Sequence, residues 1–122
     1  MIKHKTLMFS FKYACQGIIY AFRNNQNLQI HSLAGIVVVL MSILFHVSPF
    51  EMGILGVMIL LVISTEMINT AIEQMVDLIT QEHRQEAKIA KDVAAGMVLL
   101  TAIGSVIVGV LIFLPHIIEL FR

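Results

Sequence analysis

Long apolar segments alternate with short polar ones along this chain. Three apolar segments, 28–47, 52–80 and 91–114, are separated by a polar turn at 48–51 and a polar connection at 81–90. A helix needs about 20 apolar residues to cross a hydrocarbon core about 30 Å thick, and each segment reaches about that length. The pattern predicts three membrane-spanning helices, with the third closed by Pro115 because proline interrupts a helix.

The first 27 residues follow another pattern, basic at the start and amphipathic afterwards. We expect 1–27 to form a helix in the membrane interface, with its cations toward the headgroups. A signal peptide is the competing interpretation, but Lys12 interrupts the apolar run and no small-x-small cleavage site precedes Arg23. The apolar side of the helix would hold Phe11, Cys15, Ile18 and Phe22, and the polar side Lys12, Gln16 and Arg23.

Composition places the whole chain, 1–122, in one small membrane domain. Hydrophobic residues make up 58% and charged residues 13%, and the mean hydropathy is +0.90, far from the values of a soluble domain. The formal net charge is zero, so no attraction to nucleic acid is implied. A single cysteine, Cys15, excludes an intrachain disulfide.

The distribution of basic residues predicts how the chain is oriented. Lysines and arginines gather before the first apolar segment and again between the second and third, whereas the turn at 48–51 has none. Because such residues concentrate on the cytoplasmic side, we expect the N-terminus and the 81–92 loop to be cytoplasmic. The residues concerned are Lys3, Lys5, Lys12, Arg23, Arg84, Lys88 and Lys91.

The second apolar segment becomes acidic along one edge. At about 100° per residue, four side chains fall within roughly 80° of one another. This acidic stripe consists of Glu66, Asn69, Glu73 and Asp77. Carboxylates inside a membrane are expensive and face protein, water or ions. The stripe either makes hydrogen bonds between helices or binds a divalent cation such as Mg²⁺, which takes oxygen ligands from carboxylates and phosphates.

The depth of the stripe can be estimated from helix geometry. Glu66 lies about 22 Å beyond Glu51 at 1.5 Å per residue, which places it toward the cytoplasmic boundary. Lys91 and Asp92 begin the third span at the same level, where a helix N-terminus favours phosphate. The simpler alternative is that Lys91 snorkels and Asp92 caps the helix. The chain contains no Walker A or kinase glycine loop, so phosphoryl transfer would need another scaffold.

Two segments carry a resemblance to a known family: Glu66-Met-Ile-Asn69-Thr-Ala-Ile-Glu73-Gln-Met-Val-Asp77 and, after the polar loop, Ala90-Lys91-Asp92-Val-Ala-Ala-Gly96. With these segments the chain resembles the prokaryotic diacylglycerol kinase family, which includes undecaprenol kinases. The resemblance covers nearly the whole chain. It implies an all-α integral membrane protein of the bacterial inner membrane, a homotrimer of three-span protomers. Its implied activity is the direct, in-line phosphorylation of a lipid alcohol, diacylglycerol or undecaprenol, with Mg²⁺ and ATP.

The resemblance also implies roles for individual residues. Glu66 would be the general base and Glu73 a metal ligand, while Asn25 stands where the family usually places a metal-binding glutamate. An amide oxygen coordinates Mg²⁺ without adding charge. The loop reads Glu82-His83-Arg84 where the family commonly has Glu-Tyr-His. The implied nucleotide contacts are Tyr13, Asn69, Glu73, Asp77, Glu82, His83, Arg84, Lys91 and Asp92.

Two other functions use the same features. A small ion or metal transporter would also need intramembrane carboxylates, but such proteins place polar groups near the midplane, and the first and third spans carry no charge between His31 and His46 or across 93–114. A catalytically degenerate membrane subunit would bind a partner helix through the stripe. His31 and His46 are expected to be interfacial hydrogen-bonding residues, and Gly96, Gly104 and Gly109 are candidates for close helix approach.

Overall fold

The computed structural model describes residues 6–122, and the basic residues Lys3 and Lys5 lie outside this part of the chain. Within 6–122 the secondary structure consists of helices, as predicted. Helix α1 runs over Leu7–Asn24, α2 over Gln26–Leu44, α3 over Pro49–Ile79 and α4 over Gln85–Leu120. The all-α fold class is confirmed.

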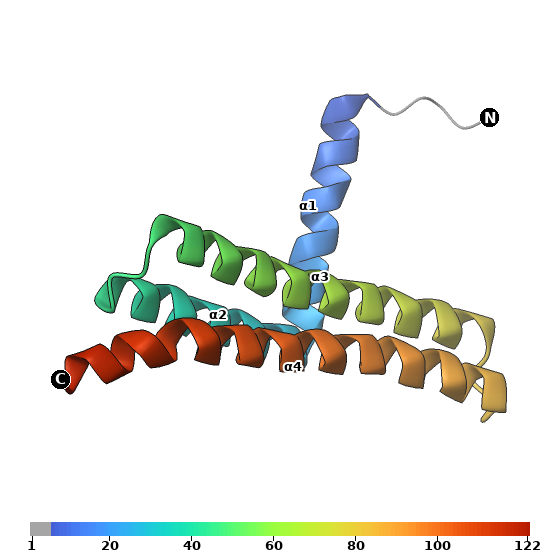
Figure 1. The fold of residues 1–122 in the computed structure, drawn as a ribbon. Coiled ribbons are helices and arrows are strands. Elements are labelled where there is room, and N and C mark those ends of the chain that lie inside the picture. The colour runs from blue at the N-terminus through green and yellow to red at the C-terminus, as the bar shows by residue number, and fades with distance from the viewer. Residues whose placement is uncertain (1–5) are drawn as a thin grey trace.

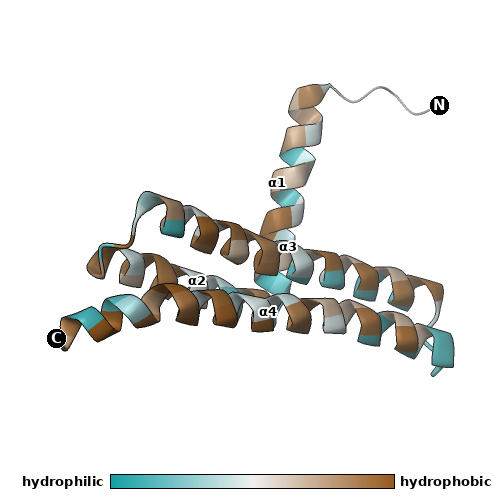
Figure 2. Cartoon of the chain, in the orientation of Figure 1, coloured by the Kyte–Doolittle hydropathy of each residue, from teal (hydrophilic) through white to brown (hydrophobic). Residues whose placement is uncertain are grey.

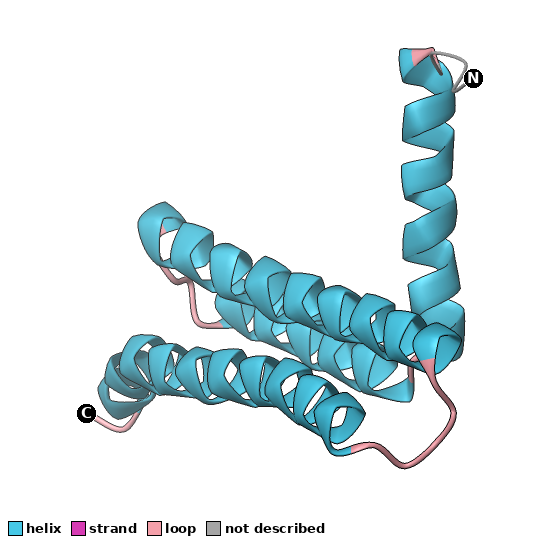
Figure 3. Ribbon diagram, turned by 90° about the vertical axis from the view of Figure 1, so that its right-hand side faces the viewer, coloured by secondary structure: helices cyan, strands magenta, loops and turns pink. Residues whose placement is uncertain are grey.

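Helices α2, α3 and α4 lie side by side in a bundle, and α1 stands crosswise to them (Figure 1). The view turned by 90° shows the same arrangement (Figure 3). Helix α3 packs against both α2 and α4 and is the central element. Inside the bundle, the hydroxyls of Thr65 on α3 and Thr101 on α4 lie 3.0 Å apart and form a hydrogen bond between the helices.

Three of the helices, α2, α3 and α4, are long and apolar enough to cross a membrane, as the sequence pattern predicts. Their 19, 31 and 36 residues correspond to about 28, 46 and 54 Å. Helices α3 and α4 are therefore longer than a hydrocarbon core of about 30 Å. The connection between them is hydrophilic, whereas most of the bundle surface is hydrophobic (Figure 2), so the α3–α4 hairpin extends beyond the apolar zone at this end.

The short connections follow from local sequence. Ser48 caps α3 by accepting a hydrogen bond from Glu51 N at 3.1 Å, and the Glu51 carboxylate accepts one from Ser48 N at 3.1 Å. Pro49 follows at the first helical position, where its missing N–H costs nothing. At the other end of α2, Asn25 alone separates α1 from α2.

The expectation that Pro115 closes the third span is wrong, because α4 continues through it to Leu120. Proline removes one backbone hydrogen bond near the helix end. Ile112 and Phe113 before it and Ile117 after it pack into the same apolar cluster as Leu55, and this packing holds the helix on both sides. Helix α4 also begins earlier than 91, at Gln85, because 85–90 are mostly good helix formers.

Among the glycines of the bundle, Gly35 lies nearest to a neighbouring helix, and the sequence pattern does not single it out. A Cβ added at Gly35 of α2 would lie 2.9 Å from Cγ2 of Ile59 on α3. A Cβ at Gly96 or Gly109 would meet nothing within 4 Å, and one at Gly104 would make an ordinary contact of 3.8 Å with Met58. Gly35 is therefore the glycine that allows α2 and α3 to pack closely.

Candidate active site

Burial decreases along the acidic stripe of α3 toward the α3–α4 loop. Glu66 is 1% exposed and Asn69 is 7% exposed, whereas Glu73 and Asp77 are exposed. The gradient agrees with the predicted order of depth, in which Glu66 is the innermost acid. A charge as deeply buried as Glu66 requires nearby polar partners.

Asn25 supplies one of these partners from the junction between α1 and α2. Its Nδ2 donates to Oε2 of Glu66 at 3.1 Å and to Oγ1 of Thr70 at 2.7 Å. Its Oδ1 accepts a hydrogen bond from Leu28 N at 3.1 Å and so caps α2. Asn25 thus ties the start of α2 to the buried carboxylate of α3.

His31 supplies the second partner of Glu66. Its Nε2 lies 3.4 Å from Oε1 of Glu66, and its side chain is 30% exposed. Each oxygen of the Glu66 carboxylate therefore has a nitrogen from α2 or its N-cap beside it. Sequence reasoning assigned His31 to the interface and did not connect it with Glu66, because no local periodicity relates residues on two helices.

A small cavity brings together the two predicted metal ligands, Glu73 and Asn25. It has a volume of about 190 Å³. Next to it, Asn69 donates from Nδ2 to Oε1 of Glu73 at 3.1 Å, while its own Oδ1 is buried without a hydrogen-bond partner among the described residues. The cavity is lined by Asn24, Asn25, Gln26, Asn27, Thr70, Glu73 and Gln74.

The oxygen atoms of this region suit a cation that is coordinated partly by the protein and partly by phosphate or water. Within 6–122 there is no cluster of three His, Cys, Asp or Glu side chains that could hold a metal ion. Glu73 contributes a carboxylate, and Asn69 contributes an unpaired amide oxygen. Mg²⁺ commonly takes one or two protein carboxylates and completes its shell with water and phosphate oxygens, and oxygen donors of this kind fit that chemistry.

A second cavity, of about 270 Å³, lies at the loop end of the α3–α4 hairpin. Lys91 Nζ of α4 lies 2.6 Å from Oδ1 of Asp77 on α3, an ion pair across its wall. Lys88 and Asp92 form another ion pair one turn apart on α4. The cavity gathers many of the predicted nucleotide contacts: Asp77, Glu82, His83, Arg84, Lys91 and Asp92.

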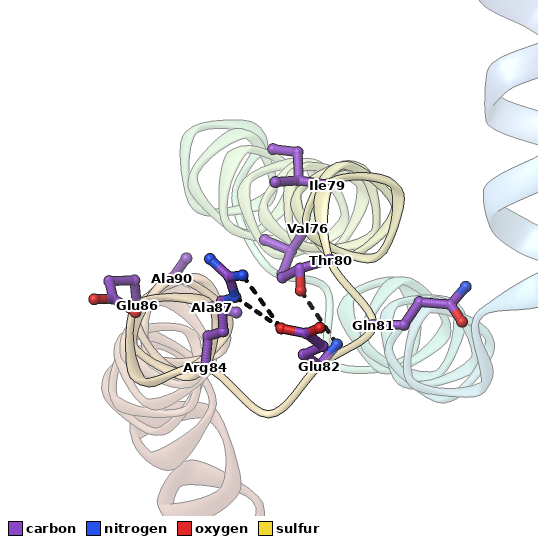
Figure 4. A pocket seen from close by; sticks show the side chains of 9 residues that line it. All are labelled: Val76, Ile79, Thr80, Gln81, Glu82, Arg84, Glu86, Ala87 and Ala90. Carbon is purple, nitrogen blue, oxygen red and sulfur yellow. Dashed lines mark hydrogen bonds and ion pairs between the residues drawn. The ribbon is translucent and has the colours of Figure 1, made fainter.

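The same loop borders a larger cavity of about 640 Å³. In Figure 4, the side chains of Arg84 and Glu82 meet over the loop, with Nε and Nη2 of Arg84 each 3.2 Å from Oε2 of Glu82. Glu82 N also donates to Oγ1 of Thr80 at 3.1 Å. Glu82 and Arg84 thus neutralise each other, whereas His83 takes part only in the lining of the smaller cavity.

Tyr13, the remaining predicted nucleotide contact, lies on α1 and is half-exposed. It does not line either cavity of the α3–α4 loop. Its role toward nucleotide stays a prediction.

Comparison with known proteins identifies the family of this chain. The sequence model described as prokaryotic diacylglycerol kinase matches residues 12–113. The chain belongs to that family. The matched range includes the acidic stripe, Asn25 and the residues of the α3–α4 hairpin, so the family assignment covers the whole candidate site.

Two curated relatives have names that describe lipid kinases. A diacylglycerol kinase of Synechocystis sp. is 43% identical over 115 residues, which are 93% of this chain and 66% of the relative. An undecaprenol kinase of Bacillus subtilis is 44% identical over 106 residues, 87% of this chain and 86% of the relative. The diacylglycerol kinase family is thus one of lipid-phosphorylating membrane enzymes, whose phosphoryl donor is a nucleotide. Membership favours a kinase over the transporter considered from sequence.

Proposed function

We propose that this protein transfers the γ-phosphoryl group of ATP directly to the hydroxyl of a membrane lipid alcohol. The observation that carries the proposal is the arrangement of the acidic stripe. A single helix, α3, holds a buried carboxylate at Glu66 and leads outward, past Glu73, to the charged cavity beside Asp77 and Lys91. A site of this form serves a reaction between an apolar acceptor in the bilayer and a charged donor in water.

Glu66 is the proposed general base. Its carboxylate is enclosed by protein, and the depth estimated from helix length puts it near the cytoplasmic boundary, where the headgroup of a lipid would enter. A base must reach the proton of the attacking hydroxyl within hydrogen-bond distance. Glu66 would accept that proton as the lipid oxygen attacks phosphorus, and the proton would remain on its carboxylate until the product leaves. No covalent enzyme intermediate is needed.

Glu73 and the unpaired Oδ1 of Asn69 are the proposed Mg²⁺ ligands, and Asn25, on the same cavity as Glu73, is a further one. The ion, when bound, would neutralise charge on the phosphate oxygens. The hydrogen bond from Asn69 to Glu73 orients the carboxylate toward this region. The contribution of Asn25 as a ligand would be weak for two reasons. Its Oδ1 already caps α2, and its amide group carries no negative charge.

The α3–α4 hairpin is the proposed nucleotide site. Lys91 and the first turn of α4 would offset the negative charge of the phosphates. Lys91 is paired with Asp77, and this pair sets the position of its ammonium group. The other proposed contacts are Tyr13, Glu82, His83, Arg84 and Asp92. Most of the rate gain would come from positioning and electrostatics, as in other phosphoryl transfers.

The proposed membrane arrangement has the N-terminus and the α3–α4 loop in the cytoplasm. The arginines and lysines at this end support it. Helix α1, crosswise to the bundle, would then lie along the membrane surface (Figure 1). The long apolar faces of α2 to α4 contact lipid or neighbouring copies, and we propose a homotrimer, as the family resemblance implies. Sedimentation of the protein in detergent would measure its oligomeric state.

The acceptor class is a lipid alcohol, either diacylglycerol or undecaprenol. The two relatives, named for different acceptors, are almost equally similar to this chain. The assay is therefore made with both. Purified protein in mixed micelles is incubated with labelled ATP, Mg²⁺ and each lipid, and labelled lipid phosphate is separated from ATP.

We expect phosphate transfer to at least one of the two lipids and its loss in Glu66→Gln, which cannot accept a proton. Glu119→Gln, the same change at the far end of α4, is the matched control and should keep the parental rate. Absence of transfer in the parent would support a degenerate subunit. Full activity of Glu66→Gln would remove Glu66 from the role of base.

A further inference from the structure

His31 lies where two features of the bundle meet. One is the carboxylate of Glu66, whose Oε1 is 3.4 Å from Nε2 of His31. The other is an apolar groove of about 470 Å³ formed by α2, α3 and α4, and His31 is the one ionisable residue among the described residues that line it. His31 therefore lies between the buried carboxylate of Glu66 and the apolar groove.

Two residues at one end of α2 lie against the carboxylate of Glu66. Asn25, the N-cap of α2, donates to Oε2 at 3.1 Å, and His31 follows six positions later with its ring nitrogen beside Oε1. A carboxylate held at one oxygen still turns about its Cγ–Cδ bond, whereas one held at both has a fixed plane. Each carboxylate oxygen has a second lone pair, and fixing the plane of the carboxylate fixes the direction in which that lone pair can accept a proton.

The surroundings of His31 explain why Glu66 is its partner. Helix α4 presents Ala102 and Ser105 to the same groove, and neither titrates. The ionisable side chains of α1 are Lys12, Tyr13, Cys15, Tyr20 and Arg23, and α1 contains no carboxylate. On α3, Glu66 is the carboxylate paired with His31.

We propose that His31 is a positioning residue for the general base, holding Oε1 of Glu66 while Asn25 holds Oε2. The inference rests on the proposed function, since it gives Glu66 a catalytic role. Near-attack geometry is sensitive, and displacement of a catalytic group by about 1 Å can reduce the rate up to roughly 100-fold. Loss of the His31 contact should thus lower kcat and leave the binding of ATP at the hairpin unchanged.

The test compares His31→Leu, which removes the nitrogen, with His31→Gln, whose amide nitrogen has a similar reach. His116→Leu is the matched control, because the Nε2 of His116 also lies beside a glutamate carboxylate, 3.0 Å from Oε2 of Glu51, at the opposite end of α3. Rates are measured in mixed micelles over a range of ATP concentrations, per mole of protein that elutes as folded in size-exclusion chromatography.

We expect kcat of His31→Leu to fall about 10- to 100-fold with KM for ATP unchanged, and His31→Gln to recover most of the loss. His116→Leu should keep the parental kcat. Parental kcat in His31→Leu, or failure of His31→Gln to recover activity, would overturn the inference. If His31→Leu does not fold, His31→Asn replaces it, because its shorter amide falls short of Oε1 and should show the same loss.

Failure of this inference is distinguishable from failure of the proposed function. An inactive Glu66→Gln together with a fully active His31→Leu would leave Glu66 as the base and remove His31 from its support. A fully active Glu66→Gln would remove the base itself.

Discussion

The side-chain nitrogen of Asn25 lies 3.1 Å from Oε2 of Glu66, a contact between two residues 41 positions apart. It joins the one residue between α1 and α2 to the most deeply buried acid of α3. The resemblance to the diacylglycerol kinase family implies a glutamate at this position, and relative to a glutamate, Asn25 offers a hydrogen-bond donor in place of a charge. The effect on catalysis depends on whether the negative charge or the hydrogen-bond donor contributes more to the rate.

Asn25→Glu should therefore have two separable effects. An added carboxylate on the cavity with Glu73 should lower the Mg²⁺ concentration for half-maximal rate several-fold, about 1 kcal/mol for one partly screened charge. The same change removes the donor to Glu66 and should lower kcat about tenfold, about 1.4 kcal/mol. Rates against free Mg²⁺ at saturating ATP measure both.

Gln29→Glu, which adds the same charge one turn along α2, is the control and should change neither value. An unchanged Mg²⁺ curve in Asn25→Glu would place Asn25 outside the metal shell. A gain of activity from an inert parent would show that the parent is a degenerate kinase.

Glu73→Gln should weaken the binding of Mg-ATP without disturbing the fold. Glu73 is exposed and accepts one hydrogen bond, from Asn69, which a glutamine oxygen also accepts. We expect the Mg²⁺ concentration for half-maximal rate to rise about tenfold, equivalent to about 1.4 kcal/mol, with part of the rate restored at high Mg²⁺. Glu119→Gln serves as the control. Full activity at ordinary Mg²⁺ would make Glu73 a structural residue.

Gly35→Ala should destabilise the bundle. A Cβ at this position would lie 2.9 Å from Cγ2 of Ile59, a methyl group fixed close to its backbone, so α2 and α3 must separate. Overpacking of this kind costs about 1–3 kcal/mol. Thermal unfolding in detergent should show a lower midpoint. Gly53→Ala, where nothing lies within 4 Å, should be neutral or slightly stabilising, and an equal loss in both variants would contradict the steric explanation.

Cysteine labelling should establish the orientation. In a Cys15→Ser background, a cysteine at Phe50, which is exposed in the first turn of α3, should react with an impermeant reagent in intact cells. A cysteine at Gln85, the first residue of α4, should react only after permeabilisation. A cysteine at Ser48 would be less suitable, because Ser48 caps α3. The reverse pattern would refute the orientation proposed from the basic residues.

The parts of the fold that depend on local pattern were predictable, and those that depend on the register between helices were not. Helical periodicity places Glu66 and Asp77 on one stripe, and a short connection brings Lys91 beside Asp77, as the structure has them. The contacts of Asn25 and His31 with Glu66 depend on how α2 lies against α3, which no window of a single helix contains. The close packing of α2 against α3 at Gly35 could not be predicted for the same reason.

Pro115 is a case in which a local sequence rule gave a wrong prediction. Local rules end the helix there, and packing of Ile112, Phe113 and Ile117 overrides them. The residues around Pro115 carry no sign of this packing in the sequence, because the partner, Leu55, lies on another helix.

The single residue between α1 and α2 has a consequence for where the chain can change its length. One residue inserted after Asn25 would rotate α2 by about 100° relative to the cap, and one inserted before it would turn α1 in the same way while separating Asn25 from its backbone bond to Ala21. The five positions 80–84 between α3 and α4 form a surface loop, where extra residues cost little. Insertions in the hairpin loop are therefore compatible with the fold, although they would disturb the proposed nucleotide contacts Glu82, His83 and Arg84, whereas insertions at the α1–α2 junction are incompatible with the fold itself.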